Sequence, residues 1–119
     1  IANEMARQGN NVFNYYFTRI RPGGEKVLAY HGAEIPYALD TTASWLPADD
    51  TDKDLTAAMS QYWLNFATTG NPNWDGLPEW PAYDIENKRY QELGDNIGPG
   101  TDLEPGICDV LDRHLQERI

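Results

Sequence analysis

The segment from Leu28 to Tyr37 reads Leu-Ala-Tyr-His-Gly-Ala-Glu-Ile-Pro-Tyr and contains His31, one of two histidines in the chain. Gly32 follows His31 directly, and a glycine lets the backbone turn sharply while leaving the neighbouring imidazole exposed. Pro36 predicts that no helix continues through the segment, because proline lacks a backbone N–H. The pattern fits a general base held on a turn. On spacing alone it also fits an ordinary loop histidine.

Two further motifs lie downstream of this segment. Residues 62–73 read Tyr-Trp-Leu-Asn-Phe-Ala-Thr-Thr-Gly-Asn-Pro-Asn, and residues 80–84 read Trp-Pro-Ala-Tyr-Asp. Together with His31-Gly32-Ala33-Glu34-Ile35-Pro36-Tyr37, they resemble three motifs of the type-B carboxylesterase/cholinesterase family, in that family's order. The resemblance runs from about Ile1 to Cys108.

The resemblance implies an α/β fold, namely the C-terminal part of an α/β-hydrolase with its mostly parallel sheet. It also implies acyl transfer by a Ser-His-Glu (or Asp) triad, in which His31 matches the catalytic base. By the same resemblance, Gly32 and Glu34 support the histidine loop. Ala33 matches a position that faces the substrate pocket, where a small side chain would leave room for a larger ester.

The chain departs from the family pattern at the nucleophile. Ser44 and Ser60 are its only serines, and neither lies in a Gly-x-Ser-x-Gly sequence. We therefore expect residues 1–119 to form a C-terminal segment of a carboxylesterase-like domain rather than an independent domain. The expected partners are the N-terminal remainder of the same esterase, in the same or a separate chain, and a small-molecule ester.

Composition limits the other partners. The formal net charge of -10 disfavours binding to a nucleic acid or to an anionic membrane, because both are negatively charged. No apolar run has the length of a membrane-spanning helix. No cofactor or metal is expected, since the run Asp49-Asp50-Thr51-Asp52 lacks the glycine and terminal glutamate of a calcium loop. The single Cys108 is either a buried thiol or, by the family resemblance, one half of a disulfide to an upstream cysteine. Nothing in the chain distinguishes a secreted from a cytoplasmic protein.

Local patterns predict the secondary structure. We expect a helix that is capped by Thr51 with Asp54 and that ends before Gly70, with its apolar face packed in the core. The other expected elements are a helix over 1–8, a strand over 12–20 buried on both faces of a parallel sheet, a turn at 21–24, an ordered loop over 38–48 packed by its own side chains, a strand over 89–93, a break at 98–100 and a helix over 104–118.

Two other interpretations remain open at this stage. One is a non-catalytic interaction or adhesion module, since some proteins with this resemblance lack a working triad. The other is an independent small α+β domain with its own ligand. His114, which lies beside Asp112 and Arg113 on the predicted final helix, is expected to be solvated surface.

Overall fold

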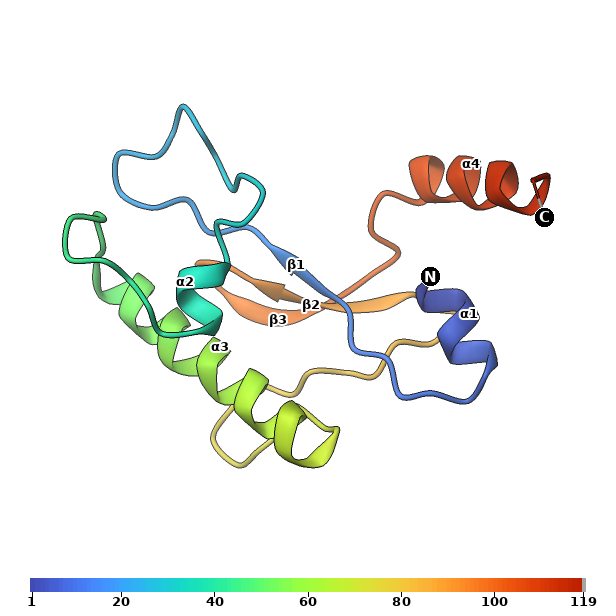
Figure 1. Ribbon diagram of the computed structural model, residues 1–119, viewed down its shortest axis with the longest axis horizontal. Helices are drawn as coiled ribbons and strands as arrows, with labels where there is room; N and C mark the ends of the chain where they lie inside the picture. The colour runs from blue at the N-terminus through green and yellow to red at the C-terminus, as the bar shows by residue number, and fades with distance from the viewer. Residues whose placement is uncertain (119) are drawn as a thin grey trace.

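The computed structural model describes residues 1–118 and contains a small three-stranded sheet with four helices (Figure 1). In chain order the elements are α1 (Ala2–Arg7), β1 (Tyr15–Phe17), α2 (Ile35–Ala38), α3 (Asp50–Thr69), β2 (Arg89–Leu93), β3 (Ile97–Thr101) and α4 (Pro105–Gln116). The predicted helices at both ends, the long central helix and the strand at 89–93 are therefore confirmed.

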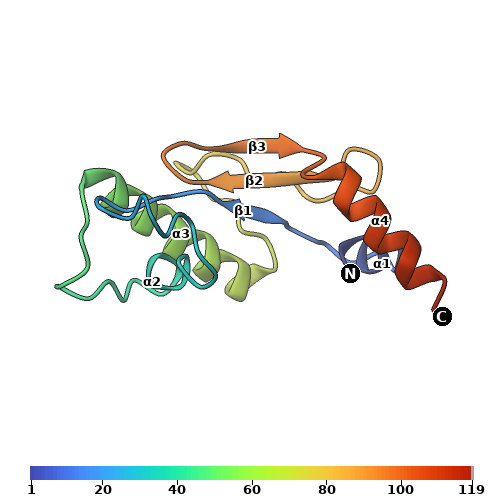
Figure 2. The same ribbon diagram turned by 90° about the horizontal axis from the view of Figure 1, so that it is seen from above.

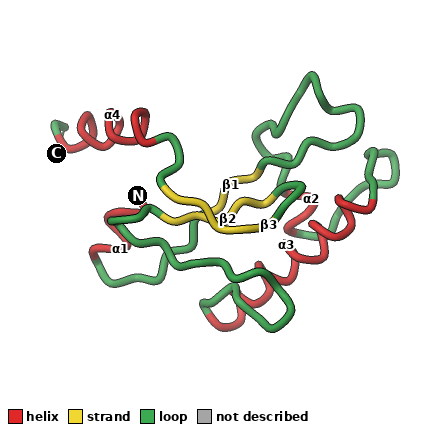
Figure 3. Tube along the Cα trace, turned by 180° about the vertical axis from the view of Figure 1, so that it is seen from behind, coloured by secondary structure: helices red, strands yellow, loops and turns green. Residues whose placement is uncertain are grey.

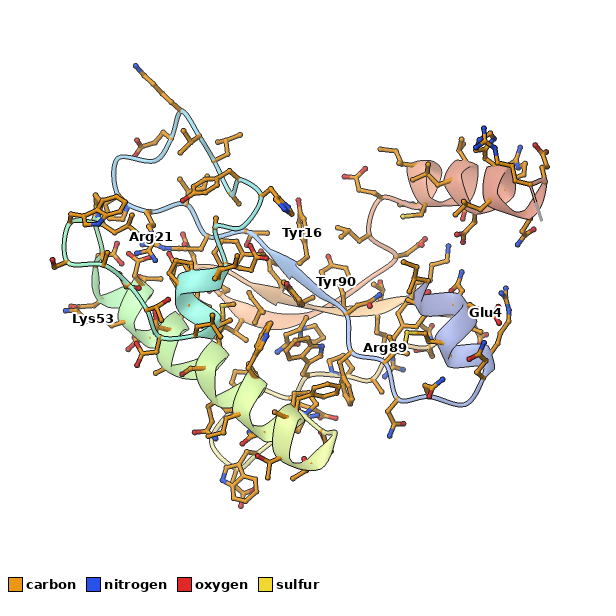
Figure 4. All side chains as sticks on the ribbon, in the orientation of Figure 1. Glu4, Tyr16, Arg21, Lys53, Arg89 and Tyr90 are labelled. Atoms are coloured by element: carbon orange, nitrogen blue, oxygen red, sulfur yellow. The ribbon has the colours of Figure 1, made fainter. Side chains whose placement is uncertain are left out.

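The sheet has the order β1-β2-β3 and is mixed. β1 runs parallel to β2, as predicted for the strand over 12–20. Tyr15 lies opposite Gln91 and Phe17 opposite Leu93. The prediction of a long strand buried on both faces is wrong, because β1 has three residues and forms an edge of the sheet. Tyr16 points away from α3 and lies against Tyr90, with 6.2 Å between their ring centroids (Figure 4).

β3 corrects the predicted break at 98–100. Gly98, Pro99 and Gly100 lie inside this strand, which pairs antiparallel with β2 through the three-residue turn 94–96. Proline is tolerated because β3 is an edge strand, where a missing N–H that faces outward costs no ladder bond. Gly100 leaves room for the ring of Tyr90, which a side chain at this position would overlap.

α3 begins two residues earlier than predicted. Its N-cap is Asp49, whose carboxylate accepts from the Asp52 N–H, and the Asp52 carboxylate accepts from the Asp49 N–H in return. This reciprocal capping box replaces the predicted pair of Thr51 and Asp54, because an aspartate satisfies free helix N–H groups better than threonine does. Gly70 ends the helix with φ of +77°, as expected.

One face of α3 forms the core with α2 and the sheet. Leu55, Met59 and Tyr62 are buried there together with Leu93 of β2 and Trp80. Trp63 packs on the edge of this cluster, and Phe66 stays largely exposed. Figure 2 shows α2 and α3 together on one side of the sheet, which explains the apolar spacing of the helix.

The loops at either side of α2 differ from the predictions. Pro36 lies in the first turn of α2, where its missing N–H is not needed, so it does not prevent a helix here. The loop over 38–48 is ordered, but Trp45 is 79% exposed and does not pack it from within. Figure 3 shows how much of this region is loop, including the long connection from β1 to α2.

The molecule is extended for its size. Its radius of gyration is 15.7 Å, whereas a compact chain of this length has about 13.5 Å. Its accessible surface is 8206 Å², whereas a folded monomer of 13.5 kDa exposes about 6,500 Å². α4 contributes to this excess, because it lies at the end of the molecule near α1 and its apolar residues are exposed (Figures 1 and 2).

Candidate functional site

His31 begins a tight turn on the connection that leads from β1 to α2. The Ala33 N–H donates to the Tyr30 carbonyl at 3.0 Å, and the Ile35 N–H donates to the Gly32 carbonyl at 3.3 Å. Gly32 has φ of +85°, a left-handed conformation that glycine adopts without strain. The imidazole is exposed and makes no hydrogen bond within residues 1–118. The turn therefore presents a free imidazole on a defined backbone.

Glu34 is held by the sheet edge. Its carboxylate accepts from the Tyr15 hydroxyl at 3.5 Å, which links the histidine turn to β1. Partial burial and the nearby Glu34 carboxylate raise the pKa of Tyr15, so the tyrosine stays a neutral donor. Within residues 1–118 the Glu34 carboxylate thus contacts the Tyr15 hydroxyl of β1 and makes no hydrogen bond to the imidazole.

Ala33 is buried, with 8% of its surface exposed, and lines a cavity of about 160 Å³. The wall of this cavity comes from the connection after β1 and from α2, and it includes Phe17, Leu28, Tyr30 and Tyr37. A larger side chain at position 33 would project into this space. Position 33 therefore lies on the wall of a cavity.

Tyr37 anchors α2 directly behind the histidine turn. Its ring is almost fully buried and packs against Phe17 of β1, with ring centroids 5.3 Å apart. The Arg21 guanidinium lies over the same ring, 4.2 Å from its centroid, and the tyrosine hydroxyl donates to Asp52 at 2.6 Å. Burial and the bond to Asp52 raise the pKa of Tyr37 well above its usual range.

Arg19 and Asp52 form the buried centre of this region. Arg19 is 7% exposed and donates to Asp52 twice, at 2.8 and 3.0 Å. It also reaches Asp49 at the start of α3 and Asp95 in the turn between β2 and β3. Burial alone would raise the pKa of the Asp52 carboxyl, but hydrogen bonds from Arg19 and Tyr37 hold that pKa well below its usual range.

Sequence reasoning missed this network. The sequence places Asp52 only in an acidic run at the start of the long helix, and Arg19 only in the predicted strand over 12–20. The spacing Asp49-x-x-Asp52 is a visible signal for a capping box. Nothing local reveals that an arginine 33 residues earlier approaches that box, because the contact depends on how β1 and α3 pack.

The other chemistry-bearing residues lie elsewhere. The Ser60 hydroxyl donates to the Ala57 carbonyl on α3, and His114 and Cys108 are exposed on α4, so Cys108 is not the buried thiol considered above. Among the described residues, no group of three or more histidine, cysteine, aspartate and glutamate side chains could hold a metal ion. None of the helices that the structure describes is long and apolar enough to cross a membrane.

Known proteins resemble this chain over most of its length. The model of the carboxylesterase family matches residues 1–108. Acylcarnitine hydrolase of Mus musculus is 34% identical over 106 residues, covering 87% of this chain and 18% of that protein. Cocaine esterase of Homo sapiens is 33% identical over 101 residues, covering 83% of this chain and 16% of that protein. The chain thus spans less than a fifth of the length of these two relatives.

Solved structures agree with the sequence comparison. A carboxylesterase of Geobacillus stearothermophilus superimposes with a TM-score of 0.71 and 30% identity, covering 85% of this chain and 22% of that chain. A PNB esterase superimposes with a TM-score of 0.70 and 27% identity, covering 83% and 21% respectively. By both sequence and structure, this chain belongs to the carboxylesterase family, and its strands and helices form part of an α/β-hydrolase fold.

Proposed function

We propose that this chain supplies His31 as the general base of a carboxylic ester hydrolase. The nucleophilic serine and the acidic residue of the triad come from protein outside these 119 residues. In this role the imidazole takes the proton from the serine hydroxyl during attack and returns it to the departing alcohol. Imidazole suits both steps because its unperturbed pKa is about 6.5.

The observation that carries this proposal is the placement of His31. It lies on the connection that follows the carboxyl end of β1, a strand in parallel pairing with β2. In open α/β sheets, ligands bind beyond the carboxyl ends of the strands. The left-handed Gly32 and the hydrogen bond from Tyr15 to Glu34 support a defined backbone turn. The imidazole is exposed on this turn, so it is accessible to a neighbouring group.

The excess surface supports an origin of the nucleophile outside this chain. The chain exposes about 1,700 Å² more than a folded monomer of its mass. Tyr15 and Tyr16 on the β1 edge, and Leu111 and Leu115 on α4, belong to the exposed apolar set. An unpaired strand edge with large apolar neighbours favours contact with further protein. We infer that the N-terminal remainder of the esterase covers these surfaces.

The test uses the full-length enzyme and p-nitrophenyl acetate as the ester. His31→Ala is expected to lower kcat by about four orders of magnitude, because the serine loses its base. His114→Ala is the matched control, since it removes the other histidine of this chain, which lies on α4 and not on the histidine turn, and it should leave kcat unchanged. Circular dichroism spectra of both variants should equal that of the wild type. A His31→Ala enzyme that retains most of its activity would remove His31 from the role of base.

The same assay separates the alternative of a non-catalytic adhesion module. That alternative predicts no turnover of p-nitrophenyl acetate by the wild-type full-length protein above the background of the ester in buffer. Turnover that depends on His31 supports the hydrolase.

A further inference from the structure

The orientation of the histidine turn depends on α2. Ile35 follows the turn at once, and the N–H groups of Tyr37 and Ala38 both donate to the Glu34 carbonyl, at 3.0 and 3.1 Å. The chain therefore has no flexible linker between His31 and this single helical turn. Any movement of α2 must move the backbone that carries the imidazole.

Tyr37 is the main attachment of α2 to the rest of the molecule. Ile35 is half exposed and Ala38 offers only a methyl group, whereas the Tyr37 side chain is almost fully buried. Phe17 and Arg21 both contact its ring, but neither contact fixes the position of the ring along the line from its Cβ to its hydroxyl. The 2.6 Å bond from its hydroxyl to Asp52 does so, because a hydrogen bond to a carboxylate has a narrow distance range.

The Asp52 side chain is itself held by several hydrogen bonds. Its carboxylate accepts from Arg19, from Tyr37 and from the Asp49 N–H, and it is 2% exposed. Arg19 is in turn attached to Asp49 and to Asp95. Through this network the Tyr37 hydroxyl is tied to the end of β1, the first turn of α3 and the turn between β2 and β3.

We propose that Tyr37 is a positioning residue for catalysis, because its bond to Asp52 fixes α2 and thereby the distance of the His31 imidazole from the serine. This inference rests on the proposed function. Tyr37 does not touch the reacting atoms. A proton transfer depends steeply on the distance between the two atoms that exchange the proton, so a small shift of the turn lowers kcat without changing how the ester binds.

The experiment compares two tyrosine variants in the full-length enzyme. Tyr37→Phe keeps the ring and its packing but removes the hydroxyl. Tyr62→Phe is the matched control, because Tyr62 is also fully buried and its hydroxyl donates to the Pro78 carbonyl. Tyr62 lies about three turns after Asp52 on α3, and this bond does not reach α2. Tyr37→Phe loses one hydrogen bond, whereas Tyr62→Phe loses two, because the Tyr62 hydroxyl also accepts from the Gln91 side chain at 3.3 Å. The control should therefore lose at least as much thermal stability as Tyr37→Phe.

We expect Tyr37→Phe to lower kcat for p-nitrophenyl acetate by about tenfold to a hundredfold, with KM within about twofold of wild type. Tyr62→Phe should keep kcat within about twofold of wild type. Labelling with diisopropyl fluorophosphate, which modifies the nucleophilic serine, adds a readout that a purely structural role would not change. In Tyr37→Phe the labelling should reach one serine per molecule but proceed more slowly, in proportion to kcat.

Three results would overturn the inference. One is a Tyr37→Phe enzyme whose kcat equals that of Tyr62→Phe. Another is a normal rate of labelling per site combined with a reduced final extent, which would mean only that fewer molecules are folded. The third is activity that does not need His31, which would also remove the proposed function. When His31→Ala is inactive and Tyr37→Phe equals its control, the proposed function stands and only the positioning role is lost.

Discussion

Replacing Arg19 by methionine tests how much the buried ion-pair network contributes to the stability of the region around the histidine turn. Methionine fills a similar length but removes the charge and both hydrogen bonds that Arg19 donates to Asp52. Asp52 then keeps only the Tyr37 hydroxyl and the Asp49 N–H, in a site where 2% of its surface is exposed. A buried carboxylate that has lost its cation costs about 3–5 kcal/mol.

Protonation of Asp52 sets a ceiling on that cost. An aspartate with an ordinary pKa of about 3.9 needs about 4 kcal/mol to take up a proton at pH 7, and about 1.5 kcal/mol at pH 5. We therefore expect Arg19→Met to destabilise the region by about 4 kcal/mol at pH 7, and by much less at pH 5. Arg89→Met is the matched control, because Arg89 pairs with Asp84 at 3.2 Å on the surface (Figure 4) and should cost less than about 1 kcal/mol.

Hydrogen exchange of the full-length protein measures the loss of local stability in each variant. Peptides that cover α2 and the first turn of α3 should exchange about a thousandfold faster in Arg19→Met at pH 7, and about tenfold faster at pH 5, after correction for intrinsic rates. Arg89→Met should change these peptides little at either pH. The reasoning fails when Arg19→Met accelerates exchange less than tenfold at pH 7, or when its effect is equally large at pH 5.

Three further predictions concern low pH, high pH and the sheet. Folding lowers the pKa of Asp52, so the contribution of the ionised Asp52 to stability is complete above about pH 4 and is lost as the pH falls further. Folding raises the pKa of Tyr37, so the contribution of the neutral Tyr37 is complete below about pH 10 and is lost as the pH rises further. Exchange of the same peptides at low pH, and the difference in phenolate absorbance between wild type and Tyr37→Phe at high pH, measure the two limits. Ionisation of Tyr37 at its ordinary pKa in the folded protein would contradict the expected high-pH limit. Gly94→Ala should destabilise the protein by about 1–3 kcal/mol in urea unfolding, because a methyl group there overlaps the Thr18 hydroxyl, whereas Gly98→Ala meets no atom within 4 Å and should cost under about 1 kcal/mol. Equal midpoints for the two glycine variants would be the contrary result.

Much of the secondary structure could be predicted because its signals are local. The apolar spacing from Leu55 to Phe66, followed by Gly70, predicts α3 without knowledge of any distant residue. The strand at 89–93 follows from its composition and from the turn residues after it. The family was identified because three short motifs occur in one order, and the family model confirms the family over residues 1–108.

The predictions failed where a neighbouring strand decides whether a segment forms a strand or becomes buried. Pro99 predicts a break, but pairing with Gln91 at a sheet edge turns the same residues into β3. The apolar run around Tyr16 predicts a buried strand, but a strand is buried only when a neighbour lies on each side, and β1 has one within residues 1–118. Helix and strand propensities do not contain this information.

The sequence by itself predicted the family, three of the helices and the strand β2, because each of these depends on residues close together in the chain, and it singled out the turn that carries His31. Only the tertiary structure decided which groups surround that turn. Arg19, Tyr37 and Asp52 are 18, 15 and 33 residues from one another. They meet because the core brings β1, α2 and α3 together, and a buried carboxylate then requires the arginine and the hydroxyl that the packing supplies.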